Sequence, residues 1–182
     1  GDDVFVAGLG VDAIAGGEGF DRLDLSNLPA AVEVDLLAGV FDVADQGVGG
    51  LSSVEAVMAG IGADRLTGDD GVNLLDAGGG DDTVIATLGP DTLVGGSGRD
   101  TLDLSRLSQG VRYERFELAV GGAGQTVSGF ETILGGSGDD RIFADDGNAS
   151  VKRLEGGAGD DNLRVTRGGD TMLGGEGDDN LT

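Results

Sequence analysis

The chain has 182 residues, with 34 acidic and 11 basic side chains, a net charge of -23 and 38 glycines. This acidic excess argues against binding to nucleic acid or to anionic membranes, whose phosphates attract cations. Cysteine and histidine are absent, which excludes disulfides, thiolate metal sites and the commonest general base. The remaining metal ligands are carboxylate and carbonyl oxygens, which suit hard cations such as calcium. No apolar run approaches the roughly 18 residues of a membrane span, and the opening GDDVFVAG has no features of a signal peptide.

Apolar residues recur at nine-residue spacing through most of the chain. A side chain that carries an oxygen atom lies two positions before each of them. The apolar series is Phe5, Ile14, Leu23, Val57, Leu66, Leu75, Val84, Leu93, Leu102, Ile133, Ile142, Leu163, Met172 and Leu181. The oxygen series is Asp3, Asp12, Asp21, Glu55, Asp64, Asn73, Asp82, Asp91, Asp100, Glu131, Asp140, Asp161, Asp170 and Asp179. Because both series stay in register over many units, they indicate an internal repeat.

The repeats form three runs separated by two inserts. Residues 1–24, 50–103 and 126–182 keep the nine-residue period, except that the stretch ADDGNASVKRLE at 144–155 is three residues too long. Residues 25–49 and 104–125 lose the period. The stretch DRLDLS at 21–26 returns as DTLDLS at 100–105, so a run and an insert together form a module that repeats after 79 residues. We therefore expect the chain to be a segment of a longer array within a larger parent protein.

The inserts have a different pattern from the repeats. VEVDL (32–36) and VRYERFEL (111–118) alternate apolar and polar residues. Such alternation predicts a half-buried β-strand in each insert. Because the inserts lack the ion-binding pattern, they are also where we expect any glycan or protein partner to bind.

The repeat unit, as in GGSGRDTLD (95–103) and GGSGDDRIF (135–143), resembles the GGxGxDxUx nonapeptide of RTX (repeats-in-toxin) proteins, where U is a large apolar residue. The resemblance covers all of the chain except the inserts. It implies an all-β fold, a right-handed parallel β-roll of the β-helix or solenoid type. In that fold a turn and a short strand form each unit, two units make one coil, and calcium ions lie between turns stacked on the same edge.

The residue types suit this arrangement on physical grounds. Glycine adopts the positive φ angles of tight turns and lets backbone carbonyls approach an ion closely. In a strand such as TVI at 83–85 the middle side chain points inward, so the apolar series is expected to line a thin core. Aspartates stacked at the strand spacing of about 4.8 Å repel one another unless a cation lies between them. We therefore expect folding to depend on several calcium ions.

The resemblance implies that each unit shares an ion with the second unit after it. The expected pairs are Asp3 with Asp21, Asp64 with Asp82, Asp82 with Asp100, Asp140 with Asp161 and Asp161 with Asp179, with a weaker pair of Asn73 and Asp91. Asp12 and Asp170 complete the set of side-chain ligands, although Ala149 stands in the aspartate position that faces Asp170. The expected carbonyl ligands are Gly17, Gly19, Gly60, Gly62, Gly78, Gly80, Gly96, Gly98, Gly136, Gly138, Gly157, Gly159, Gly175 and Gly177. Glu55 and Glu131 are either ligands or caps, and the sequence favours neither.

Other interpretations fit the residues less well. GDDGVNLLD at 68–76 lacks the residue order of an EF-hand loop. Paired carboxylates can form a glycosidase site, but here they are equivalent copies, and we expect no catalytic site in this chain. The basic residues Arg106, Arg112, Arg115, Lys152 and Arg153 are expected to pair with the acidic surroundings, or to contact an acidic glycan or a partner subunit.

The expected function follows from these features. We expect a calcium-binding module of a secreted bacterial protein, located outside the cell or at its surface, that folds when calcium binds and serves a structural, adhesive or secretion-linked role. Type I secretion from a Gram-negative bacterium is implied by the resemblance alone. The alternative is an accessory region of a secreted enzyme or toxin, such as a protease, lipase, epimerase or cytolysin, whose catalytic domain lies outside this chain.

Overall fold

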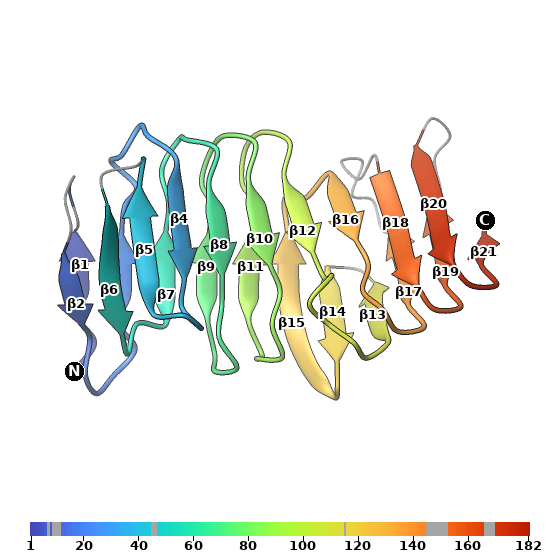
Figure 1. The fold of residues 1–182 in the computed structure, drawn as a ribbon, viewed down its shortest axis with the longest axis horizontal. Helices are drawn as coiled ribbons and strands as arrows, with labels where there is room; N and C mark the ends of the chain where they lie inside the picture. The colour runs from blue at the N-terminus through green and yellow to red at the C-terminus, as the bar shows by residue number, and fades with distance from the viewer. Residues whose placement is uncertain (7, 9–11, 45–46, 115, 145–152, 166–169) are drawn as a thin grey trace.

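The computed structural model describes residues 1–6, 8, 12–44, 47–114, 116–144, 153–165 and 170–182. These residues form short β-strands in two sheets that extend along one axis, with the N-terminus and the C-terminus at opposite ends (Figure 1). None of the described residues belongs to a helix that could cross a membrane. The structure confirms the predicted all-β fold of stacked parallel repeats.

The larger sheet contains 11 strands. In spatial order they are β1 (Val4–Val6), β3 (Arg22–Asp24), β7 (Ala56–Met58), β9 (Leu74–Asp76), β11 (Thr92–Val94), β15 (Ala123–Ser128), β14 (Glu117–Val120), β13 (Val111–Glu114), β17 (Arg141–Ala144), β19 (Asn162–Val165) and β21 (Asn180–Leu181). The smaller sheet contains 10 strands. They are β2 (Ala13–Ala15), β6 (Val48–Ser52), β5 (Val40–Val43), β4 (Val32–Asp35), β8 (Arg65–Thr67), β10 (Thr83–Ile85), β12 (Thr101–Asp103), β16 (Thr132–Leu134), β18 (Arg153–Ala158) and β20 (Thr171–Glu176).

Successive repeat strands alternate between the two sheets, so each strand pairs in parallel with the second repeat after it. Val84, for example, pairs with Leu66 on one side and with Leu102 on the other. All three side chains are fully buried. The apolar series therefore forms the predicted core, one inward side chain per strand. It is exposed only near the chain ends, where Leu181 keeps 40% of its surface because its coil has no neighbour beyond it.

Each insert adds a three-stranded meander to one sheet. In the first, β4, β5 and β6 are antiparallel to one another, while β4 pairs in parallel with β8 and β6 with β2. In the second, β13, β14 and β15 do the same between β17 and β11. β6 and β15 continue past residues 49 and 125, where the sequence places the ends of the inserts.

The prediction of one strand over residues 111–118 is wrong. The segment is a hairpin in which Tyr113 pairs with Leu118, and Phe116 in the turn has a φ of 65°. Apolar residues alternate at odd positions up to Tyr113 and at even positions from Phe116 onward. This shift of the alternation marks the turn. No glycine or proline accompanies it, so the usual turn signal was absent. The prediction for VEVDL holds, because β4 covers Val32–Asp35.

The two meanders lie on opposite sheets. An insert takes the place of one strand, and the six repeat strands β7 to β12 separate the first insert from the second. One module therefore occupies an odd number of strand positions. Because successive positions alternate between the two sheets, the next insert lies in the other sheet. As a result, the added strands of the first insert in the 10-stranded sheet are matched by those of the second insert in the 11-stranded sheet.

Candidate metal centres

The aspartates of the repeats form a hydrogen-bonded ladder along each edge of the roll. The backbone N–H of Asp64 donates to Asp82 Oδ1 (2.7 Å), and that of Asp82 donates to Asp100 Oδ1 (3.0 Å). The same bond joins Asp3 to Asp21, Asn73 to Asp91, Asp140 to Asp161 and Asp161 to Asp179. The structure therefore places side by side all six pairs that the repeat pattern indicates.

Four of these aspartates have a second oxygen with no hydrogen-bond donor. They are Asp21, Asp82, Asp100 and Asp161, each at most 2% exposed, and in each the unpartnered atom is Oδ2. A buried carboxylate oxygen that has lost water and gained no partner is costly. These four positions therefore need either a proton or a cation.

The space beside these oxygens is lined by backbone carbonyls. A Cβ atom added to Gly156 would overlap Asp161 Oδ2 and lie 2.5 Å from the carbonyl oxygen of Gly174 in the next coil. A Cβ added to Gly95 would overlap the Gly129 carbonyl oxygen and lie 3.0 Å from Asp100 Oδ2. Carboxylate and carbonyl oxygens thus border the same small space, which only glycine leaves open. This donor set fits calcium, which binds oxygens in flexible geometry.

Ten of the fourteen expected carbonyl ligands adopt positive φ. These are Gly17, Gly19, Gly78, Gly80, Gly96, Gly98, Gly157, Gly159, Gly175 and Gly177. The other four, Gly60, Gly62, Gly136 and Gly138, do not. Their turns differ chemically too, because Gly60 and Gly136 direct N–H groups at Asp64 Oδ2 (3.2 Å) and Asp140 Oδ2 (2.9 Å).

The aspartate positions therefore divide into two classes. In Asp64 and Asp140 both carboxylate oxygens accept backbone N–H groups. Oδ1 of Asp64 accepts from Val32 and Oδ2 from Gly60. Oδ1 of Asp140 accepts from Val111 and Oδ2 from Gly136. We call these two carboxylates closed. We call Asp21, Asp82, Asp100 and Asp161 open, because Oδ2 of each has no hydrogen-bond partner.

Asn73 and Asp91 also have partners. Asn73 Oδ1 accepts from the backbone of Asp69 (2.7 Å), and Thr87 Oγ1 lies 3.2 Å from Asp91 Oδ2. The protein thus supplies the hydrogen bond at Asn73. At Asp91 the single Thr87 hydroxyl proton is shared, because Thr87 Oγ1 also lies 2.7 Å from the Asp69 carbonyl oxygen.

Burial raises the pKa of the ladder aspartates. Desolvation, together with the charges of neighbouring carboxylates, raises the pKa of Asp82 and of Asp161 to about 6. Burial also raises the pKa of Asp64, Asp91, Asp100 and Asp140. Ionising them inside the calcium-free fold is therefore unfavourable, and a cation relieves the same cost.

Glu55 and Glu131 take the aspartate place in the ladder. The N–H of Asp21 donates to Glu55 Oε2 (2.8 Å), and that of Asp100 donates to Glu131 Oε2 (2.9 Å). Each glutamate thus extends the hydrogen-bonded ladder by one coil beyond the last aspartate.

The sequence reasoning missed a second ladder on the outer side of the turns. Asp81 accepts the N–H of Arg99 (2.9 Å), Asp139 that of Asp160 (3.0 Å), and Asp160 that of Asp178 (2.9 Å). The Asp-Asp doublets of the GDD turns were the available signal. In the first ladder the earlier coil donates the N–H, whereas in this second ladder the later coil donates it. The two ladders together therefore link adjacent turns by hydrogen bonds in both directions.

Other expected ligands lie at the ends of the described roll. Asp3 and Asp12 are exposed, and Asp170 and Asp179 are partly exposed. Ala149, which the sequence places opposite Asp170, lies outside the described residues.

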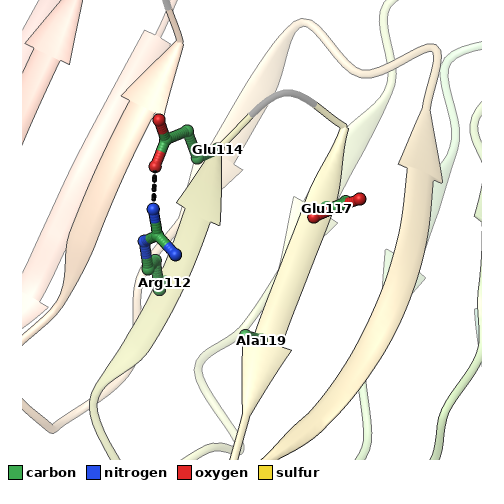
Figure 2. Close-up of a pocket in the computed structure, with 4 residues that line it drawn as sticks. All are labelled: Arg112, Glu114, Glu117 and Ala119. Carbon is green, nitrogen blue, oxygen red and sulfur yellow. Dashed lines mark hydrogen bonds and ion pairs between the residues drawn. The ribbon is translucent and has the colours of Figure 1, made fainter.

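Most of the expected basic cluster pairs with acids. Arg106 lies 3.7 Å from Asp35 of the first insert, and Arg153 pairs with Glu155, whereas Arg115 and Lys152 lie outside the described residues. Figure 2 shows Arg112 and Glu114 of β13 pointing toward each other, beside Glu117 of β14. They line an open pocket of about 280 Å³.

In the part of the chain that the structure describes, no three acidic side chains converge as metal ligands.

The family model of the RTX calcium-binding nonapeptide repeat (4 copies) matches residues 1–23, 50–84, 58–93, 77–106, 126–148 and 153–182. These matches cover the repeat runs and leave out most of both inserts. No curated protein matches the sequence. The nonapeptide register, the stacked turns and the family match agree, and the chain belongs to the RTX calcium-binding nonapeptide repeat family.

Proposed function

We propose that this chain is a calcium-gated folding module of a secreted protein, with a structural, adhesive or secretion-linked role outside the cell. The observation that carries the proposal is the set of four buried carboxylate oxygens without a donor, at Asp21, Asp82, Asp100 and Asp161. RTX repeats are calcium-binding modules typical of secreted proteins. Calcium carries positive charge and binds several oxygen ligands at once. It would therefore give these buried oxygens the partner that they lack.

The chain's own residues explain the dependence on the ion. With a net charge of -23 and repeat strands that each bury one residue of the apolar series, the chain has strong self-repulsion and a narrow core outside the inserts. Calcium-scarce conditions, as in the cytosol, therefore favour the unfolded chain. Sites of the extracellular type, with dissociation constants of about 10⁻⁴–10⁻³ M, fill outside the cell and stabilise only the folded state.

The binding itself is tested by equilibrium dialysis with calcium-45, with magnesium as competitor. We expect several ions per chain and little competition, because magnesium demands smaller, near-octahedral sites and gives up its water reluctantly. A chain that binds no calcium at millimolar concentration would contradict the proposal.

Acid should stabilise the calcium-free protein. The pKa values of Asp82 and Asp161 rise to about 6 in the fold, above the ordinary 3.8. Folding therefore takes up protons, and the cost of ionisation grows as the pH rises from about 3.8 to about 6. We expect a larger β-rich signal at about pH 5 than at about pH 7.5 in calcium-depleted buffer, measured by far-ultraviolet circular dichroism.

The double variant Asp82→Asn/Asp161→Asn is the control for this effect, because it should reduce the pH dependence. With saturating calcium the trend should reverse, since protons then compete with the ion for the same oxygens. A calcium-free protein that is more stable near neutral pH than in mild acid would show that these carboxylates are not the destabilising groups.

A further inference from the structure

Two glutamates stand at the same point of the two modules, where each insert ends. Glu55 follows β6 and Glu131 follows β15, in turns that read SSVE and SGFE and have lost the GGxGxD pattern. Nothing in the repeat motif assigns them a function. Both turns nevertheless keep the ladder bond, from Asp21 N–H to Glu55 Oε2 (2.8 Å) and from Asp100 N–H to Glu131 Oε2 (2.9 Å).

The aspartates that face these glutamates are both of the open class. Asp21 and Asp100 are 0% exposed, and Oδ2 of each has no hydrogen-bond partner. Each carboxylate therefore directs an unpartnered oxygen into a turn whose other side belongs to the glutamate coil. The same arrangement in two places, with different neighbouring sequence, argues for a built feature.

A backbone carbonyl of the glutamate turn reaches the same space. A Cβ added to Gly16 would overlap the Ser53 carbonyl oxygen and lie 2.5 Å from Asp21 Oδ2. Ser53 has a φ of 51°, and its counterpart Gly129 has a φ of 77°. A left-handed conformation is unfavourable for serine and persists only where the surroundings require it. Its carbonyl position beside Asp21 Oδ2 provides such a requirement.

We propose that each insert is closed by a calcium site of mixed type: Asp21 with Glu55 and the Ser53 carbonyl, and Asp100 with Glu131 and the Gly129 carbonyl. The proposal rests on the proposed function, since it requires that the chain bind calcium.

The other flank of each insert is closed without an ion. Asp64 accepts from Val32 and Gly60, and Asp140 accepts from Val111, so hydrogen bonds join each insert to the repeats that follow it. The mixed site is the corresponding link to the repeats that precede the insert. It ties together residues 34 apart in the first module and 31 apart in the second. Closing these loops orders the meander between them.

The test uses Glu55→Gln, Glu131→Gln and the double variant. Glutamine keeps a carbonyl oxygen for the aspartate N–H and removes only the charge, so a role as hydrogen-bond cap is preserved. Glu117→Gln on the exposed face of β14 is the matched control. We expect calcium-45 dialysis to show one ion fewer in each single variant, two fewer in the double variant, and no change in the control.

Hydrogen exchange in calcium gives a local readout. In Glu55→Gln the amides of β4 and β5 should exchange about tenfold to a hundredfold faster, the factor expected for losing one site at about 10 mM calcium, while β13 and β14 keep their protection. Glu131→Gln should show the reverse, so each variant controls for the other. Glu55→Asp and Glu131→Asp retain the charge and should retain the bound ion.

Unchanged ion counts and unchanged insert protection in both glutamine variants, with a wild type that binds calcium, would overturn this inference and leave the glutamates as caps. Loss of an ion in the aspartate variants as well as in the glutamine variants would also overturn it, because charge would not be the determining property. A wild type that binds no calcium would instead refute the proposed function.

Discussion

The variant Asp82→Asn is expected to lose calcium-dependent stability, whereas Asp91→Asn keeps it. Asp82 lies between Asp64 and Asp100 in the ladder and has a buried, unpartnered Oδ2. At about 10 mM calcium, one site with a dissociation constant of about 10⁻⁴–10⁻³ M contributes about 1.4–2.7 kcal/mol. The amide oxygen of the substituted side chain would still accept the Asp64 N–H, so the loss reports the missing charge and not a broken ladder.

Asp91→Asn is the matched control on the opposite edge. Asp91 is equally buried and accepts the same ladder bond, from Asn73 (2.9 Å), but Thr87 lies 3.2 Å from its second oxygen. Burial raises the pKa of Asp91, so a neutral amide there should leave stability unchanged or slightly higher. Calcium titrations of both variants by far-ultraviolet circular dichroism, together with urea unfolding in saturating calcium, measure the difference. Equal losses of calcium-dependent stability in the two variants would refute the division into two classes.

Gly98→Ala should be among the most damaging single methyl additions in the repeats. Gly98 has a φ of 141°, and a Cβ there would overlap the carbonyl oxygen of Gly80 in the neighbouring coil. The backbone conformation alone costs an alanine about 1–3 kcal/mol. Displacement of the Gly80 carbonyl, one of the expected calcium ligands, should add a loss of calcium affinity. Thermal unfolding in calcium and calcium-45 dialysis measure the two effects.

Gly124→Ala provides the comparison within one residue type. No atom lies within 4 Å of a Cβ added to Gly124 in β15, and alanine is better than glycine inside a strand. This variant should match the wild type or slightly exceed it in stability. If Gly98→Ala were as stable and bound calcium as tightly as Gly124→Ala, the turns would not have the tight geometry that the sites require.

The repeats could be predicted from sequence because their structure is set within nine residues. Leu66, Val84 and Leu102 occupy one column of the core, as their spacing indicates. The inserts could not be predicted as fully, because β5, β6 and β15 depend on pairing with strands that are distant in the sequence. The glycine turns and the short strands after them therefore followed from local rules, and the meanders did not.

The division of the aspartates is also invisible in the sequence. Asp140 and Asp161 both end complete GGxGDD turns, yet Asp140 Oδ2 accepts an N–H (2.9 Å) and Asp161 Oδ2 has no partner. The difference lies in the neighbouring coil. The turn of Asp140 stacks on the insert, where Ser137 N–H donates to the Leu107 carbonyl (3.1 Å), whereas Asp161 accepts the ladder bond of another repeat. Which coil lies next to a turn is decided by the fold, not by the motif.

The central claim is that calcium controls folding through the buried, unpartnered carboxylates. The most direct measurement is far-ultraviolet circular dichroism during a calcium titration from excess chelator, with magnesium as the control. A cooperative change from a coil spectrum to a β-rich spectrum, with calcium alone, is the predicted result. A β-rich spectrum that is already complete in excess chelator and unaffected by calcium would contradict the claim, because the roll would then be stable on its own.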